Sequence, residues 1–275
     1  MTGKLAGTTE RVTGFLREFF VAEQTARGEG FLQSRDPRLK LLSIVGLLVG
    51  AMLTRTAAVL VGVLALTALL ARLSAVPLRR LLARSAPIPL ASMLVVSPQA
   101  VLMPGEPLVG AFGLAVTDAG VAYVGLFTLR VAAGVSLLSV LVLTTPFATI
   151  VGAMRRLYVP VALVWVIAVT YRYLFLFFDE LRRLVLARNS RTAGEDSLRG
   201  EWRDARRLSG TFLLRALDRG ERVGRGMRAR GGGREPTPYD RGSSLDVGDC
   251  ALAATAVVVV AVAVVVRWGL LPWVI

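Results

Sequence analysis

The sequence predicts an all-α membrane protein with about five transmembrane helices and several long helices that are cytoplasmic or interfacial. Hydrophobic residues make up 54% of the chain, and its mean hydropathy is +0.60, above the usual range of soluble domains. The net charge of +14 is the balance of 31 arginines and two lysines against 19 acidic residues, and the arginines are concentrated between the apolar stretches. This distribution is the positive-inside pattern of an inner-membrane protein, so we expect a lipid bilayer and no nucleic acid as partner.

The first segment, 1–38, is polar and mixed in charge, and we expect it to lie in the cytoplasm. It lacks the apolar core of a cleaved signal peptide. The spacing of Phe15 and Phe19 suits a helix on the membrane surface and equally a solvated helix. At its end, Asp36 precedes Pro37 and Arg38, so it either pairs with Arg38 or caps the first spanning helix.

Residues 39–144 are predicted to form a four-helix transmembrane part. A span needs about 20 mostly apolar residues, and fewer where neighbouring helices cover its ends. The stretches that meet this requirement are 39–54, 56–73, 87–103 and 120–144. We expect the first two to form a tight hairpin around Arg55, with close packing permitted by Gly46, Gly50 and Gly62.

Two further features of this part stand out. The stretch 104–117 is rich in Gly and Pro and is predicted to be a loop. Arg130 lies within the fourth span, where a charge is costly, so we expect it to pair inside the protein.

The next region, 145–235, is predicted to hold three cytoplasmic helices. Thr145 and Pro146 are typical of a helix start, and Pro160 ends that helix near Tyr158. A second helix is expected over 161–189 and a third over 201–227. Apolar residues recur at helical spacing in the third helix and predict one buried face: Trp202, Ala205, Leu208, Phe212, Ala216, Val223 and Met227.

The stretch 161–178 is apolar enough to cross the membrane, but the charges oppose a crossing. With Arg72 to Arg84 in the cytoplasm, a crossing would place 182–234 and its 15 arginines outside. We therefore expect a helix that runs along or obliquely into the inner interface, with Arg172 at the headgroup level.

The last part, 236–275, is then a linker followed by a span at 251–273 with Trp268 and Trp273 as interfacial anchors. This span carries the chain outward. The sequence thus predicts a multi-pass protein of a prokaryotic cell membrane, with a cytoplasmic N-terminus and an extracytoplasmic C-terminus.

Each of the two longest cytoplasmic helices ends at a short arginine motif, Ser190-Arg191-Thr192 and Ala229-Arg230-Gly231. A glycine commonly terminates a helix, and a cation in the last turn gains ~0.3–1 kcal/mol from the helix dipole. A guanidinium fork at a helix tip also suits bidentate docking onto a carboxylate of another protein. Spacing alone leaves both interpretations open.

Several chemical functions are excluded by the sequence. It has no histidine, one cysteine (Cys250), and no carboxylate cluster with ligand spacing, so we expect no metal site. It has no phosphate-binding loop, so ATP is not hydrolysed by that route. Adjacent Asp179 and Glu180 would point to different sides of a helix, unlike the carboxylate pair of a prenyl transferase. We expect no catalytic residue and no bound cofactor.

Several local sequences occur in an order that resembles a known family. They are Leu32-Gln33-Ser34-Arg35-Asp36-Pro37-Arg38-Leu39-Lys40, Leu143-Thr144-Thr145-Pro146-Phe147, Met154-Arg155-Arg156-Leu157-Tyr158-Val159-Pro160, Thr170-Tyr171-Arg172-Tyr173-Leu174-Phe175, Leu186-Ala187-Arg188-Asn189-Ser190-Arg191-Thr192 and Met227-Arg228-Ala229-Arg230-Gly231. From about residue 23 onward, the chain resembles the transmembrane coupling subunit (T component) of energy-coupling-factor ABC transporters, most closely its cobalt-type branch.

The resemblance implies a non-catalytic subunit placed between two cytoplasmic ATP-binding subunits, which hold ATP and Mg, and a small substrate-binding membrane subunit. It implies that Arg191 and Arg230, with flanking Ser190, Thr192, Ala229 and Gly231, dock on the ATPases. The family's usual first motif is Ala-Arg-Gly, from which Ser-Arg-Thr departs. Cobalt uptake is the expected role; nickel, a vitamin such as biotin or thiamin, several substrates, or a non-transport scaffold are the alternatives.

Overall fold

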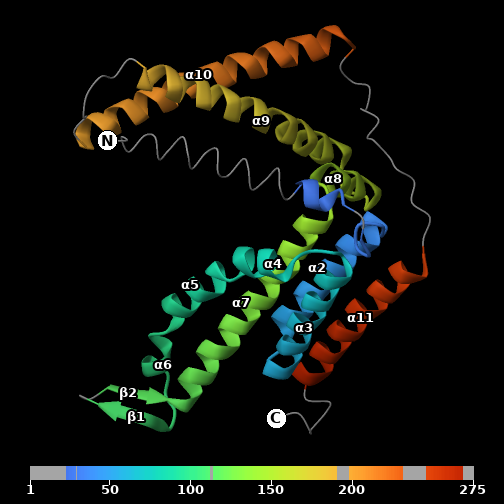
Figure 1. Cartoon of the computed structure of the whole chain (residues 1–275), viewed down its shortest axis with the longest axis vertical. Helices are drawn as coiled ribbons and strands as arrows, with labels where there is room; N and C mark the ends of the chain where they lie inside the picture. The colour runs from blue at the N-terminus through green and yellow to red at the C-terminus, as the bar shows by residue number, and fades with distance from the viewer. Residues whose placement is uncertain (1–22, 29, 112–113, 191–197, 232–245, 269–275) are drawn as a thin grey trace. The chain divides into compact units, whose positions relative to one another are not determined.

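A computed structural model describes residues 23–28, 30–111, 114–190, 198–231 and 246–268 (Figure 1). The described chain is almost entirely helical, which confirms the predicted all-α membrane fold. The chain forms two compact units. A helix bundle draws on 22–153 and 241–275, and a second unit draws on 1–21 and 154–240. The predicted division at residues 38, 144 and 235 stays a prediction.

The helix bundle is built around one long central helix, α7, which packs against the helices of the N-terminal half. A second long contact joins α11 to α2 along their length, as Figure 1 shows. The elements are α2 (Pro37–Leu53), α3 (Ala57–Leu73), α4 (Leu78–Ser85), α5 (Pro87–Val96), α6 (Gln99–Leu102), β1 (Pro107–Ala111), β2 (Leu114–Thr117), α7 (Asp118–Thr144) and α11 (Val247–Arg267).

Most predicted spans correspond to helices whose ends lie within a few residues of the prediction. By length and composition, four described helical stretches can cross a membrane: Leu78–Leu102, Asp118–Thr144, Val161–Ala187 and Val247–Val266, with Ala57–Leu73 as a shorter apolar helix. The third predicted span, 87–103, differs in detail. It is the end of a longer apolar stretch that breaks into α4, α5 and α6 at Pro87 and Pro98.

The predicted loop at 104–117 also differs from the structure, because most of it forms a two-stranded antiparallel hairpin, β1–β2. The hairpin leads directly into α7. The Thr117 hydroxyl accepts a hydrogen bond from the Gly120 amide (3.2 Å) and donates one to the Met103 carbonyl (2.9 Å). Thr117 thereby caps α7 and ties it to the end of α6.

Two of the three glycines expected to permit close packing do so, but against α11 rather than within an α2–α3 hairpin. A Cβ on Gly50 would lie 3.2 Å from Val259 Cγ1, and one on Gly46 would lie 3.6 Å from Ala256 Cβ. The third, Gly62, faces open space, with no heavy atom within 4 Å of an added Cβ. Glycines four residues apart on α2 therefore bring α11 close, as small residues do between membrane helices.

The second unit follows the predicted helices closely. α8 (Phe147–Arg156) continues into it from the bundle, Tyr158 adopts a left-handed φ of 60°, and α9 begins at Val161. α9 (Val161–Asn189) and α10 (Leu198–Ala229) cross each other, as Figure 1 shows. At the crossing, the rings of Phe177 and Phe212 lie 5.9 Å apart at 78°, and Arg215 pairs with Glu180 at 2.5 Å.

The predicted buried face of α10 is present over only part of its length. Leu208, Phe212, Ala216, Val223 and Met227 are partly buried along one stripe. Trp202, however, is 77% exposed, and Ala205 is exposed as well. The reason is the single crossing with α9, because two helices that diverge from one contact cannot cover each other's full length.

We predict that Gly50→Leu lowers the stability of the bundle by ~1–3 kcal/mol, because its side chain would have to push Val259 and α11 away. Gly62→Leu, the same change at an exposed site on α3, serves as the control and should be near neutral or stabilising. Thermal unfolding of the detergent-solubilised chains measures both. Equal losses at the two positions would contradict the α2–α11 packing.

Candidate functional site

The tip of α10 displays Arg230 to solvent. The Arg230 amide donates to the Gly226 and Met227 carbonyls (3.2 Å each), and Gly231 then takes a φ of +79°, which ends the helix. A left-handed glycine just past the last helical residue is the common helix terminator. Ala229, Arg230 and Gly231 are all exposed. The tip is therefore accessible to a partner.

The tip of α9 is described only up to Ser190. The Ser190 amide donates to the Leu186 carbonyl (3.0 Å), and its hydroxyl donates to the Ala187 carbonyl (3.0 Å). Ser190 thus closes the last turn of α9. The other two residues of this motif, Arg191 and Thr192, lie outside the described residues, so their docking role stays a prediction.

The crossing of α9 and α10 sets the two tips apart. Counting from the crossing at Phe177 and Phe212, Ser190 lies about 20 Å along α9 and Arg230 about 27 Å along α10, at about 1.5 Å per residue. In Figure 1 the C-terminal ends of the two helices point away from each other. The unit therefore has two separate arms, each ending at a motif.

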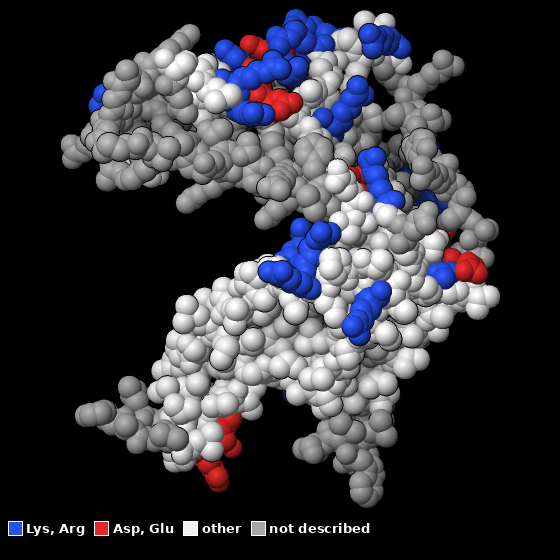
Figure 2. All heavy atoms as spheres, viewed as in Figure 1, with Lys and Arg blue, Asp and Glu red and all other residues white. Residues whose placement is uncertain are grey.

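Between the tips, the surface of α10 is strongly basic. Figure 2 shows arginine side chains gathered over this helix on the face drawn. Its exposed arginines are Arg203, Arg206, Arg207, Arg215, Arg222, Arg225 and Arg228, whereas its described exposed carboxylates are Asp218 and Glu221. This excess of positive charge suits an acidic protein surface or anionic lipid.

The other predicted residues have distinct positions. Arg172 is exposed on α9, and its position at the headgroup level stays a prediction. Arg130 pairs inside the bundle, where its Nη2 donates to the Thr54 carbonyl at the end of α2 (2.8 Å). Asp36 caps α2, because its carboxylate accepts from the Arg38 backbone amide (2.8 Å). Of the two roles considered for Asp36, pairing with Arg38 or capping the helix, this contact is the helix cap.

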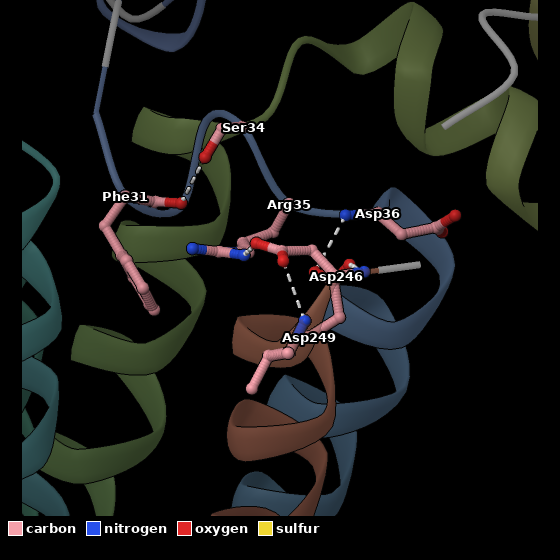
Figure 3. A network of polar contacts seen from close by, with 7 residues as sticks. Phe31, Ser34, Arg35, Asp36, Asp246 and Asp249 are labelled. Carbon is pink, nitrogen blue, oxygen red and sulfur yellow. Dashed lines mark hydrogen bonds and ion pairs between the residues drawn. The ribbon is translucent and has the colours of Figure 1, made fainter. Parts of the chain in front are cut away.

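Sequence reasoning missed a network at the start of α2 and α11, which we call the polar junction: the loop Phe31–Asp36, Lys40 and Asp246–Asp249. Figure 3 shows Arg35 and Asp246 paired, with Asp249 Oδ1 accepting from the Asp36 amide (3.1 Å). The Arg35 guanidinium also lies 4.3 Å from the centre of the Phe31 ring. The partners are 211 and 213 residues apart in sequence, so local patterns give no sign of them.

Lys40 is a deeply buried charged member of the junction, with only 1% of its surface exposed. Its Nζ donates to the Leu32 carbonyl (2.7 Å) and to the Thr144 carbonyl (2.9 Å). Its one available sequence signal is its rarity, since the chain has 31 arginines and only one other lysine. Among the described residues, no group of three or more His, Cys, Asp or Glu has the arrangement of a metal site.

Comparisons with known proteins identify a family for this chain. A family model described as CbiQ, cobalt transport protein, matches residues 28–239. The chain is 27% identical over 270 residues to Uncharacterized protein MJ1571 of Methanocaldococcus jannaschii, an alignment that covers 96% of this chain and 92% of that protein. It is also 32% identical over 122 residues to the cobalt transport protein CbiQ of Rhodobacter capsulatus, which covers 44% of this chain and 50% of that protein.

The Arg35–Asp246 pair predicts a specific response to acid. The Arg35 guanidinium and then the Val247 amide hold the pKa of the Asp246 carboxyl below its ordinary value. A lowered pKa stabilises the fold above the ordinary value of about 3.9, and that contribution is lost as the pH falls through the lowered pKa.

We therefore expect Asp246→Asn to unfold at a lower temperature than wild type at neutral pH and to lose less stability on acidification below about pH 4. Asn is as good a helix cap as Asp, so the change removes the ion pair and keeps the cap. Melting temperatures of the two chains in detergent across this pH range measure the effect. Parallel acid profiles would show that the pair does not contribute.

Proposed function

Because this chain belongs to the CbiQ cobalt transport protein family, we propose that it is the transmembrane coupling subunit of an energy-coupling-factor importer. In this role it passes ATP-driven motion from two cytoplasmic ATP-binding subunits to a small substrate-binding membrane subunit. The observation that carries the proposal is the display of Arg230 at an exposed, glycine-terminated helix tip. The chain contributes no catalytic residue in this proposal, and its partners hold ATP and Mg.

The geometry of the tips supports docking on two ATPase copies. A planar guanidinium donates two parallel hydrogen bonds to one carboxylate, which gives both strength and orientation. An exposed arginine at the end of a long helix reaches a groove without requiring the helix itself to enter. Two tips on diverging arms suit two ATP-binding subunits that lie side by side, with Arg230 on one and Arg191 proposed for the other.

The apolar surface of α9 supports a membrane environment and a membrane partner. The stretch Val161–Ala187 is long and apolar enough to lie in a membrane, and only 6% of its most apolar part is buried inside the chain. α10 adds exposed Leu213, Leu214 and Leu217. Apolar surface of this extent needs a cover, which lipid and the substrate-binding subunit would supply.

The connections of the bundle argue that α9 does not cross the membrane by itself. The end of α7 and the start of α11 lie at the same end of α2, because Lys40 bonds to Thr144 and Asp36 bonds to Asp249. The chain between them therefore crosses an even number of times or not at all. α10 carries too many arginines to provide a second crossing. We propose that α9 and α10 both stay on one side.

That side is proposed to be the cytoplasm. The same end of the bundle carries Arg72, Arg79, Arg80 and Arg84, and Arg80 Nη1 donates to Thr25 Oγ1 (3.0 Å). Glu106 and Asp118 lie beside the hairpin, next to the opposite end of α7, where Asp118 Oδ1 accepts from the Glu106 amide (3.0 Å). By the positive-inside rule the arginine end faces the cytoplasm, which leaves the C-terminus outside in a prokaryotic cell membrane.

Cobalt ion is the substrate we propose for the assembled importer. The support is the family and the similarity to the Rhodobacter capsulatus protein named as a cobalt transport protein. This chain has no histidine, so the cation would be held by the substrate-binding subunit. A nickel or vitamin importer of the same architecture is the alternative, and the identity of the co-purifying membrane subunit distinguishes them.

We predict that Arg230→Ala lowers the amount of ATP-binding subunit bound to the chain, because one of the two proposed docking contacts is lost. A desolvated charge pair at an interface loses ~2–5 kcal/mol when one partner is truncated. Arg203→Ala, at an exposed arginine of the same helix about 40 Å from Arg230, is the matched control. Co-purification of ATPases with tagged chains measures the effect. Equal ATPase yield from wild type and Arg230→Ala would refute the docking role.

The proposed topology predicts which residues are accessible from outside intact cells. In a Cys250→Ser background, which removes the one native cysteine, we expect Arg55→Cys to react with a membrane-impermeant maleimide in intact cells. Ser190→Cys should react only after permeabilisation, because α9 stays inside. Both sites are exposed. Labelling of Ser190→Cys in intact cells would mean that α9 crosses the membrane.

A further inference from the structure

Lys40 holds the end of α7 from inside the bundle. Thr144 is the last residue of α7, and carbonyls in the last turn of a helix have no partner within the helix. The Lys40 ammonium donates a hydrogen bond to the Thr144 carbonyl (2.9 Å). Its positive charge is favoured by the negative end of the α7 dipole. The start of α8, Phe147, follows three residues later.

The same ammonium also binds the loop before α2, through the Leu32 carbonyl at 2.7 Å. That loop is fixed on its other side by α3, because the Leu32 amide donates to Ser74 Oγ (3.2 Å) and Gln33 Nε2 donates to the Ser74 carbonyl (2.9 Å). Lys40 therefore joins the end of α7 to a loop that cannot shift without breaking contacts with α3.

A second connection reaches the same loop from α11. Asp246 precedes α11 and pairs with Arg35, and Asp249 in the first turn accepts from the Asp36 amide. Gly248 leaves room for this pairing, since a Cβ there would collide with the Arg35 guanidinium. The Arg35 side chain is only 13% exposed, whereas that of Asp246 is 63% exposed.

The two connections lie near the two places where 154–240, part of the second unit, leaves and re-enters the bundle. Thr144 shortly precedes α8, which leads out of the bundle, and Asp246 directly precedes α11. Lys40 holds the chain before α8, and Arg35 holds it before α11. Both act on the loop Phe31–Asp36, so a displacement at either end is resisted by the same element.

We propose that Lys40 is a positioning residue that, with the Arg35–Asp246 pair, makes the junction a rigid anchor through which nucleotide-driven motion of the cytoplasmic helices enters the transmembrane bundle. The inference rests on the proposed coupling function and adds the point of transmission. Without the Lys40 ammonium, the buried Leu32 and Thr144 carbonyls lose their charged partner, and the end of α7 is free to move independently of the loop. Motion of the cytoplasmic helices would then not be transmitted through the polar junction to the bundle.

The native Cys250 provides a reporter next to the polar junction. It lies in the first turn of α11, it is exposed, and its amide is 3.4 Å from the Asp246 carbonyl. We would purify the full chain with its bound ATPases and measure the alkylation rate of Cys250 on this chain, with and without trapping by ATP, Mg²⁺ and vanadate. This readout does not depend on which substrate the importer carries.

Three variants test the proposal. Lys40→Met removes the ammonium and keeps the length of the side chain. Asp246→Asn removes the ion pair but keeps the cap, and because Asp246 is largely exposed this variant should fold even where Lys40→Met does not. Arg84→Met removes one exposed positive charge from α4, at the same end of the bundle, and is the control.

In wild type and Arg84→Met we expect trapping to change the alkylation rate by about fivefold or more, the lower end of typical coupling between sites. In Lys40→Met and Asp246→Asn, at equal ATPase content, the dependence on nucleotide should disappear. A wild-type rate that does not respond to trapping, or a wild-type response in Asp246→Asn, overturns the inference while the coupling function stands. If no ATPase co-purifies with the wild-type chain, that result contradicts the proposed function and therefore also the inference that rests on it.

Discussion

The helix bundle of this protein depends on a buried lysine. Its described hydrogen bonds are to main-chain carbonyls and not to a carboxylate. Lys40 is 1% exposed, and its ammonium bonds to two main-chain carbonyls. Removing a charge from water costs several kcal/mol, so such a site persists only where the geometry of its partners is fixed. Here the partners are the end of α7 and the loop before α2. These contacts fix the chain just before α8, and the Arg35–Asp246 pair fixes it just before α11.

Charged side chains have different environments at the tip of α10 and at the polar junction. At the tip of α10, Arg230 is exposed, and an exposed guanidinium gains little from a partner until the contact is desolvated. Such a contact can form and break. At the junction, Lys40 and Arg35 are enclosed and already bonded within the chain. The exposed tip is therefore suited to reversible docking, and the polar junction is suited to holding the helices in position.

The sequence predicted what local chemistry determines. Thr145, Pro146 and Pro160 bracket α8, Gly231 ends α10, and the apolar stretches became helices, because caps, breakers and hydropathy act within a few residues. It did not predict the partners of Lys40 or Arg35, which lie 104 and 211 residues away. It also predicted close packing at Gly46 and Gly50 without indicating α11 as the neighbour, since periodicity shows which face is small but not which helix covers it.

The ambiguity of α9 shows why both kinds of information are needed. Its composition alone fits a membrane span, and its length does as well. The hydrogen bonds from Lys40 to Thr144 and from Asp36 to Asp249 constrain it indirectly, because they place both ends of the intervening chain at one end of the bundle. A single crossing is then incompatible with the connectivity, and the arginines of α10 oppose a second one. If α9 stays on one side, as we propose, its apolar surface would contact lipid or a membrane partner along its side, as the proposed coupling function requires.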